Sequence, residues 1–261
     1  MQSEISQDIA QCAQTVRTGD PDRFLSAMTA SGETRDALMV LYAFNVEVSR
    51  APWVTAEPMI AEMRLQWWFD AIEEIFEGGA VRRHQVVTPL AELVRRTGLR
   101  RDWLHGIVGA RQWDIYKEPH ADGDALDGYL SATGGGLMGL AVASCGGDGD
   151  AAYEYGAGCA VARLLLAVPA LEQAARYPLV DGTTTGIKTL AEAGLARAEA
   201  ARRMMGKPSK GARAALRADW VARGILKQAV RDPALVAAGG LGMSDAGKKL
   251  RLIWMSALGR Y

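Results

Sequence analysis

The sequence predicts a single all-α domain, for three reasons. Apolar residues recur at three- and four-residue steps along most of the chain, a spacing that gives a helix one apolar face. No segment sustains the alternation of apolar and polar residues that a half-buried strand requires, and the nearest, Gln85–Thr88, is too short. No repeat, low-complexity tract or long linker divides the 261 residues, so we expect residues 1–261 to form one domain.

Four helices are expected in the N-terminal third: at residues 3–17, from residue 20, at 33–50 and at 63–76. Asp20 followed by Pro21 has the cap and first-turn proline that begin a helix. The helix at 33–50 ends before Pro52, because proline removes a backbone donor and restricts the residue before it. The helix at 63–76 has two apolar ridges that begin at Trp67 and Trp68, with acidic residues pointing away from them.

The remaining chain predicts further helices, at residues 90–96, 102–116, 126–145 and 151–175 and in several stretches between 189 and 261. The helix at 126–145 has an unusually glycine-rich middle, which permits close packing of helices. The segment at 151–175 is long enough for one helix with a bend near Pro169.

The composition is that of an ordinary globular protein and gives no electrostatic reason to bind nucleic acid. Thirty Lys and Arg balance thirty Asp and Glu, so no global field favours a polyanion. The first residues are polar and acidic, unlike a signal or transit peptide, and no apolar run approaches the roughly 18–20 residues that span a bilayer. The three cysteines are scattered along the chain, which favours buried thiols in a reducing compartment. We therefore expect a soluble cytoplasmic protein.

Three sequence patterns carry a resemblance to a known family. They are Arg35, the run Leu-Tyr-Ala-Phe at Leu41–Phe44, and Arg-Leu-Gln-Trp-Trp at Arg64–Trp68. Together they resemble the squalene/phytoene synthase family, from about Phe24 to Leu258. The resemblance implies an isoprenoid-synthase-type helical bundle around a central cavity. In the family's enzymes, two Asp-rich motifs on helices that face each other across the cavity hold magnesium against a substrate diphosphate.

The first Asp-rich motif is expected to be missing here. By the resemblance, the positions that match its aspartates are Ser49, Arg50 and Trp53. Ionising an allylic diphosphate requires neutralising about three negative charges, which magnesium ions bridging phosphate and carboxylate oxygens can do. Without these carboxylates, we expect no catalytic residue, no metal ligand and no cofactor at this site.

The second motif should fall within Gly156–Leu171, and its carboxylates are replaced as well. By the resemblance, Ala167 and Leu171 match the two aspartates, and Arg163 matches an asparagine. Arg163 is the single charge in an otherwise apolar segment. It could bind an anion in the cavity, or it could pair with a buried acid.

Other polar residues have a plain structural explanation beside a functional one. Asp70 and Glu74 have the four-residue spacing of a metal site, but they lie opposite the double-Trp face, which favours a solvated surface. Asp114 could be a polar cavity residue or a local partner of Arg111. Tyr129 precedes a glycine-rich stretch that resembles a pocket-lining helix of the family. The three histidines lie far apart in sequence and form no recognisable set of metal ligands.

Seven residues are expected to line the cavity, without assigned roles: Tyr42, Asn45, Ser49, Trp67, Asp114, Tyr129 and Arg163. Outside the cavity, the stretch Arg197–Arg231 holds ten Lys or Arg against only Glu199 and Asp219. A solvated surface explains such a stretch. A peripheral contact of residues 197–231 with an anionic membrane surface, or with an acidic partner, explains it too.

Three functional hypotheses follow. The pattern Ala-Phe-Asn-Val-Glu at Ala43–Glu47, with both Asp motifs replaced, looks like the branch of the family that includes a mitochondrial respiratory complex I assembly factor. That resemblance implies a non-catalytic protein, peripheral to the inner membrane, that helps to assemble the NADH:quinone oxidoreductase or binds a lipid there. The alternative is a prenyltransferase that joins two prenyl diphosphates and requires either magnesium or cations such as Arg50 and Arg163 in its place. The third is a binding protein for a prenyl chain or another apolar ligand.

Overall fold

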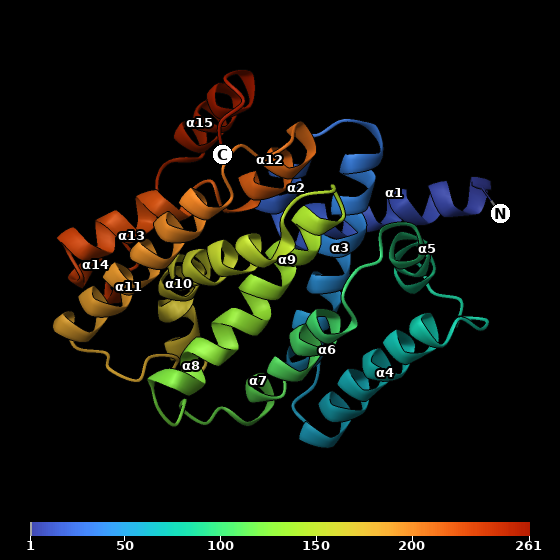
Figure 1. Cartoon of the computed structure of the whole chain (residues 1–261). Helices are drawn as coiled ribbons and strands as arrows, with labels where there is room; N and C mark the ends of the chain where they lie inside the picture. The colour runs from blue at the N-terminus through green and yellow to red at the C-terminus, as the bar shows by residue number, and fades with distance from the viewer. Residues whose placement is uncertain (1) are drawn as a thin grey trace.

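Helices joined by loops and turns make up residues 2–261, the part of the chain that the computed structural model describes, and no strand occurs among them (Figure 1). The all-α prediction is confirmed. The first half of the chain contains α1 (Gln2–Gly19), α2 (Pro21–Ala27), α3 (Gly32–Arg50), the 3-10 turn η1 (Ala51–Trp53), α4 (Pro58–Glu77), α5 (Val87–Thr97), α6 (Arg101–Ala110) and α7 (Trp113–Tyr116). The second half contains α8 (Gly123–Leu130), the π-helical turn η2 (Ser131–Gly135), α9 (Gly136–Ala143), α10 (Gly149–Gln173), α11 (Thr184–Met204), α12 (Lys210–Leu216), the 3-10 turn η3 (Arg217–Asp219), α13 (Ala222–Arg231), α14 (Ala234–Ala237) and α15 (Asp245–Ala257).

Helix α3 passes through the middle of the molecule (Figure 1). Its residues 37–46 are all buried, so neighbouring helices cover it on every side instead of along one stripe. It is preceded by α2, whose N-terminus is capped by Asp20 as the sequence predicts: the carboxylate accepts a hydrogen bond from the backbone N–H of Arg23 at 3.0 Å. At its other end, Pro52 lies in the turn η1, where the chain leaves the core.

Helices α8 and α9 form one rod with the π-helical turn η2 between them, where the sequence predicts a single helix at 126–145. The glycines of this turn lie against α10. A Cβ atom built on Gly134 would lie 2.5 Å from the Cβ of Ala160, and one built on Gly135 would lie 2.9 Å from the carbonyl oxygen of Tyr153. These positions therefore require glycine because the two helix backbones approach each other closely.

Helix α10 is the longest helix and packs on α9, α11 and η2. By length and composition alone it could cross a membrane, which the sequence analysis does not anticipate, but 61% of its most apolar window is buried inside the protein. Pro169 lies within it, as expected for a segment at 151–175. Gly158 of α10 and Gly194 of α11 allow the two helices to touch, since a Cβ on Gly158 would lie 2.7 Å from the Gly194 carbonyl oxygen.

Several helix boundaries differ from the predicted ones: α5 begins at Val87 instead of residue 90, and α8 at Gly123 instead of residue 126. Helix α4 begins at Pro58 instead of residue 63, with the proline in its first turn, and ends at Gly78, which adopts a left-handed φ of 74° as the expected C-cap. The helix predicted at 102–116 is divided into α6 and α7. The chain tightens there into i→i+3 turns, with Gln112 N–H donating to the Gly109 carbonyl and Asp114 N–H to the Arg111 carbonyl, both at 3.1 Å.

Candidate functional site

A cavity of about 310 Å³ lies between α3 and α10, and we call it the α3–α10 cavity. Side chains from α2, η1, α7 and the α8–η2 rod complete its lining. Its lining residues are Arg23, Asn45, Ser49, Trp53, Arg111, Trp113, Asp114, Tyr129, Leu130, Thr133, Gly134, Ala160, Arg163, Leu164, Ala167 and Leu171. Five of the seven residues expected to line a cavity are among them.

Tyr42 and Trp67 are the two that the structure places elsewhere. Tyr42 is 1% exposed and lies in the core, with the guanidinium of Arg23 5.7 Å from its ring centroid. Trp67 points toward the loop between α4 and α5, where Arg82 stacks on its ring at 4.8 Å and His84 contacts it at 5.1 Å between ring centroids. Trp67 itself therefore faces this loop, whereas Ala71 and Ile75 of the same ridge are buried in the core together with Trp68 and Ile72.

One polar network in the cavity joins α6, α7 and α8. The Arg111 guanidinium donates to the Tyr129 hydroxyl at 2.7 Å and pairs with the Asp114 carboxylate at 3.2 Å. The Tyr129 hydroxyl in turn donates to Asp114 at 3.2 Å. Burial raises the pKa of Tyr129 to about 12, so its hydroxyl remains a proton donor. Both sequence alternatives for Asp114 hold, since it lines the cavity and pairs with Arg111.

A second network fixes Arg163 on α10. Its Nε lies 2.8 Å from Asp219, which is 3% exposed, and its Nη2 donates to the Ala218 carbonyl at 2.7 Å. Burial alone would lower the pKa of Arg163, but the nearby charges of Asp219 and Asp20 outweigh it and raise the pKa. Arg163 therefore pairs with a buried acid, and it also lines the cavity.

The cavity holds buried donors that lack an acceptor. Within the described part of the chain, the Nε atoms of Arg23 and Arg111 and the indole Nε1 of Trp113 are buried without a hydrogen-bond partner. Arg176 is 3% exposed with its guanidinium stacked at 4.2 Å on the Trp53 ring, and its Nε and Nη1 also lack partners. Buried donors of this kind are costly unless an acceptor reaches them, so the arrangement suits a ligand with oxygen acceptors.

The same residues do not suit magnesium. Among the described residues that line the cavity, Asp114 is the only carboxylate, and it is engaged by Arg111 and Tyr129. The positions that the resemblance matches to aspartates present Ser49, Trp53, Ala167 and Leu171 to the cavity. Ser49 uses its hydroxyl on the Val46 carbonyl of its own helix at 3.0 Å. Magnesium prefers several carboxylate and water oxygens in an octahedron, and this set of donors supplies too few of them.

Sequence reasoning missed Arg23, Arg111 and Trp113 as cavity residues. Arg23 lies on a short helix that carries no part of the family pattern, and only the fold brings α2 beside α10. Arg111 and Trp113 flank the break between α6 and α7, which the sequence analysis treats as one helix. The sequence gives one usable signal for Arg111: it precedes Asp114 by three residues, and residues three apart can pair in a turn of helix.

Asp70 and Glu74, which have the four-residue spacing of a metal site, each bond a neighbouring side chain instead. Glu74 receives hydrogen bonds from Arg82, at 2.6 Å between Oε1 and Nη2, and these bonds lower the pKa of Glu74 to about 2. Asp70 accepts a hydrogen bond from Gln66 at 2.7 Å. Among the described residues, no group of three or more His, Cys, Asp or Glu side chains could hold a metal ion.

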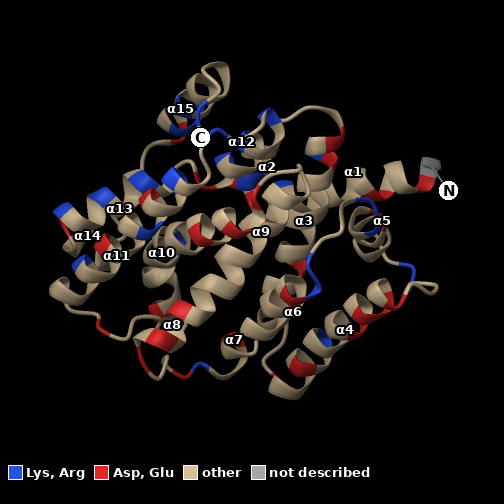
Figure 2. Cartoon of the chain, in the orientation of Figure 1, with Lys and Arg blue, Asp and Glu red and all other residues tan. Residues whose placement is uncertain are grey.

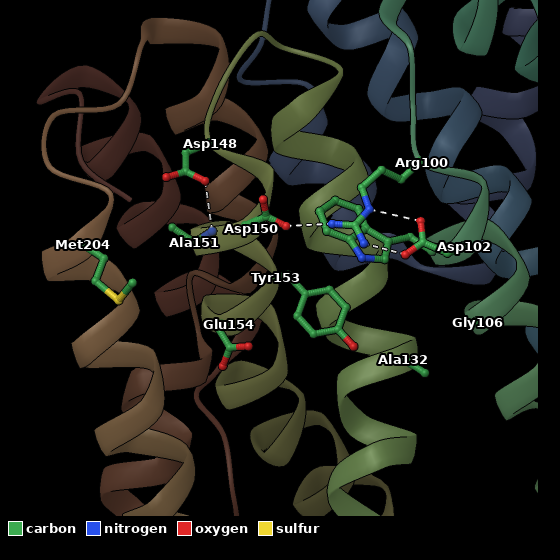
Figure 3. Close-up of a pocket in the computed structure, with 11 residues that line it drawn as sticks. Arg100, Asp102, Gly106, Ala132, Asp148, Asp150, Ala151, Tyr153, Glu154 and Met204 are labelled. Carbon is green, nitrogen blue, oxygen red and sulfur yellow. Dashed lines mark hydrogen bonds and ion pairs between the residues drawn. The ribbon is translucent and has the colours of Figure 1, made fainter.

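A separate surface cavity of about 710 Å³ lies between α6, η2 and α10. Figure 3 shows Arg100 directed at Asp102 and Asp150, whereas Asp148 accepts a hydrogen bond from the backbone N–H of Ala151, and Glu154, which pairs with Arg197, stands apart. Arg100 stands between Asp102 and Asp150, 2.8 Å from the latter, and its guanidinium stacks at 4.2 Å on Trp103. The lining holds one cation against four acidic side chains, Asp102, Asp148, Asp150 and Glu154, so this cavity suits an anionic ligand less well than the α3–α10 cavity does.

The fold and the site together define the class of protein, an α-helical bundle of the isoprenoid-synthase type. A family model described as Squalene/phytoene synthase matches residues 16–244. The chain therefore belongs to the squalene/phytoene synthase family.

Solved structures confirm the fold. A dehydrosqualene synthase in complex with a ligand superposes with a TM-score of 0.80 at 14% identity, covering 98% of this chain and 97% of that one. The squalene synthase HpnC from Alicyclobacillus acidocaldarius superposes with a TM-score of 0.72 at 16% identity, covering 92% of this chain and 97% of that one.

Among curated proteins, the similar ones are complex I assembly factors. "NADH dehydrogenase (ubiquinone) complex I, assembly factor 6" of Homo sapiens is 28% identical over 128 residues, 49% of this chain and 38% of the human protein. The homologue of Drosophila melanogaster is 37% identical over 106 residues, 39% of this chain and 32% of the fly protein. The matches thus span only about a third of the length of these relatives. The predicted family and its divergent branch are both confirmed.

Proposed function

We propose that this protein is a non-catalytic member of its family that binds a lipid-like ligand in the α3–α10 cavity and assists the assembly of the respiratory NADH:quinone oxidoreductase. The observation that carries the proposal is the set of side chains that line the cavity. Arg23, Arg111 and Arg163 line it, and they pair with the carboxylates of Asp20, Asp114 and Asp219. A guanidinium has five N–H donors, so these groups can pair with their carboxylates and also bind an anionic head, whereas the lining lacks the ligands for the metal that ionises a diphosphate.

The loss of metal ligands has a large expected effect on the rate. Each factor of ten in rate corresponds to about 1.4 kcal/mol of transition-state stabilisation. Removing several magnesium ligands at once therefore predicts turnover below any useful level, unless the arginines stabilise the leaving diphosphate. Arg163 is already committed to Asp219 and the Ala218 carbonyl. Arg50 has a side chain that is 62% exposed, where it lies 3.9 Å from Glu47, and it does not line the cavity.

The lining supports a ligand with a polar head and an apolar body. The buried donors of Arg23, Arg111 and Trp113 face an acceptor-bearing head, whereas Leu130, Leu164, Ala167 and Leu171 provide an apolar wall. The volume of about 310 Å³ lies at the lower end of the roughly 300–1,000 Å³ of typical ligand pockets. A prenyl diphosphate or a comparable lipid head with part of its chain has the required chemistry.

The role in assembly is supported by the relatives. The human and fly proteins are named as complex I assembly factors, and they match 49% and 39% of this chain. We propose that the partner is a subunit of the respiratory complex and that the protein works from the cytoplasm at the periphery of the inner membrane, without a metal cofactor.

The test combines binding with turnover. Purified protein is incubated with farnesyl or geranylgeranyl diphosphate, with and without magnesium, while binding and product are measured. We expect binding that does not require magnesium, and no product. Replacing Arg111 by Gln removes a charged donor and should weaken binding by about tenfold or more, because a hydrogen bond to a charged group contributes roughly 1.5–3 kcal/mol. Arg64→Gln on the exposed side of α4 is the matched control and should change nothing.

Metal-dependent product would refute the non-catalytic proposal and establish the prenyltransferase alternative. Deleting the gene tests the assembly role separately: we expect less assembled oxidoreductase with normal levels of prenyl lipids. The reverse pattern, with normal oxidoreductase and depleted prenyl lipids, would refute that role.

A further inference from the structure

Helix α15 has an apolar face that is largely exposed, and within the described chain Arg260 stacks on one of its side chains, Trp254. Its inner residues Leu252 and Met255 pack on Trp220 in a small cluster apart from the main core. On its outer side, Leu250 is 69% exposed, Ile253 66% and Trp254 53%. Residues at steps of three and four share one face of a helix, so these side chains form a continuous stripe. Figure 1 shows α15 projecting from the body of the molecule.

Basic residues flank this stripe. At about 100° per residue, Lys249 and Arg251 fall on either side of the direction set by Leu250 and Trp254. Within the described part of the chain, neither has a carboxylate within ion-pair distance. A helix with an apolar stripe between free Lys and Arg side chains has the composition of one that lies in the interface of an anionic bilayer.

Next to α15 lies a cavity of about 870 Å³, which we call the basic cavity. Six of its cations have no carboxylate partner among the described residues: Arg202, Arg203, Lys207, Arg213, Arg251 and Arg260. Its two acidic residues are already paired, Glu199 with Arg223 at 3.1 Å and Asp219 with Arg163 at 2.8 Å. Figure 2 shows Lys and Arg gathered on α11, α12, α13 and α15, the helices that form it.

Two buried N–H donors of residues that line the basic cavity lack an acceptor in the described structure. The Nε of Arg213 and the indole Nε1 of Trp220 are buried and lack a hydrogen-bond partner in the described structure, and Trp220 is only 2% exposed. Two guanidinium groups are held by stacking, Arg202 at 4.4 Å from the Tyr261 ring and Arg260 at 4.6 Å from the Trp254 ring. Stacking fixes these groups while leaving their N–H donors available to phosphate oxygens.

From these two features we propose that the protein docks on an anionic membrane, with the outer stripe of α15 inserted among the acyl chains and the basic cavity holding a phospholipid phosphate. Because Trp254 and Arg251 belong both to α15 and to the wall of the basic cavity, the insertion of α15 brings the cavity to the level of the headgroups. The excess of unpaired cations selects an anionic surface over a neutral one, and over a partner bound by apolar contact alone.

The experiment is flotation of the full chain with vesicles of phosphatidylcholine, alone or mixed with phosphatidylglycerol. We expect binding to the mixed vesicles, weaker binding to the neutral ones, and a loss on adding salt. Each Lys or Arg near an anionic surface contributes about fivefold in affinity, so Arg202→Ala with Arg213→Ala should reduce binding by roughly 25-fold. Ile253→Ser with Trp254→Ser should reduce binding to both kinds of vesicle.

Matched controls lie on α4, far from α15 (Figure 1). Met59→Ser with Met63→Ser removes two apolar side chains that are 72% and 66% exposed, and Arg64→Glu reverses an exposed charge. Both should bind as the unchanged protein does. Equal binding to neutral and anionic vesicles, or an equal loss in the controls, would overturn the proposal. So would tight binding of soluble glycerol phosphate with no effect of the Ile253 and Trp254 changes, because the cavity would then serve a free phosphate compound.

Discussion

The close approach of η2 and α10 in the cavity wall gives a sharp test of the structure. A methyl group added by Gly134→Ala would place its carbon 2.5 Å from the Cβ of Ala160 and 3.1 Å from the Gly156 carbonyl oxygen. Carbon atoms in favourable contact lie about 3.5–4.0 Å apart, so α10 and η2 must separate by an ångström or so. Overpacking a core costs roughly 1–3 kcal/mol, and we expect about 3 kcal/mol here because both backbones are buried.

The measurement is the free energy of unfolding by denaturant, with Gly128→Ala as the matched control. Gly128 lies on the preceding helix α8, and a Cβ there has nothing within 4 Å. Alanine is favoured over glycine in a helix by up to about 1 kcal/mol, so the control should be stabilised. The double variant with Ala160→Gly removes the 2.5 Å contact and should recover part of the loss, which gives a double-mutant cycle. Equal stability of the two single variants would refute the close approach.

Three further predictions concern buried charges and thiols. Arg163→Gln should lower the free energy of unfolding by about 3 kcal/mol, because it leaves Asp219 buried without its partner; denaturant titration measures this, and a change below about 1 kcal/mol would contradict the pairing. The pKa of Asp20 is lowered, since Arg23 and Arg163 outweigh the opposing effect of burial. Its stabilising effect is therefore complete above its unfolded pKa of about 3.9 and is lost as the pH falls through the folded pKa, which acid titration of the unfolding midpoint should show. Burial, aided by the charge of Asp8, raises the pKa of Cys12 to about 12, so a thiol reagent should modify Cys12 at pH 8 only after unfolding, as peptide mapping would reveal.

The sequence predicts the fold well because the fold depends on patterns that single segments carry. The apolar spacing of residues 33–50, the proline after it and the cap at Asp20 are local features, and the helices they predict are present. The glycines at 134–136 also indicate close packing. Which partner they approach is not a local feature, since Ala160 and Tyr153 come from a different helix.

The cavity is predicted only in part, for the same reason. Asn45 and Ser49 are predictable cavity residues because they share one face of a helix. Arg163 is predictable because it is the single charge of an apolar segment. Trp67 lies outside the residues that line the cavity, because the periodicity of α4 indicates which side chains can be buried but not which of them reach the cavity. Arg23 is contributed by a helix whose position depends on tertiary packing, which no pattern within residues 21–27 reveals.

The position of Arg163 also shows why the cavity could not regain metal chemistry by a simple exchange of residues. A guanidinium on α10 is tolerated because Asp219 from η3 and Asp20 beside α2 lie 2.8 Å and 3.8 Å from it. Arg23 and Arg111 add two more cations to the same cavity. Carboxylates placed at Ala167 and Leu171 would share the cavity with these arginines, and ion pairs with them would occupy the oxygens that a magnesium ion requires. The cavity is therefore built around cations through contacts from several distant parts of the chain, and its chemistry favours holding an anion over ionising one.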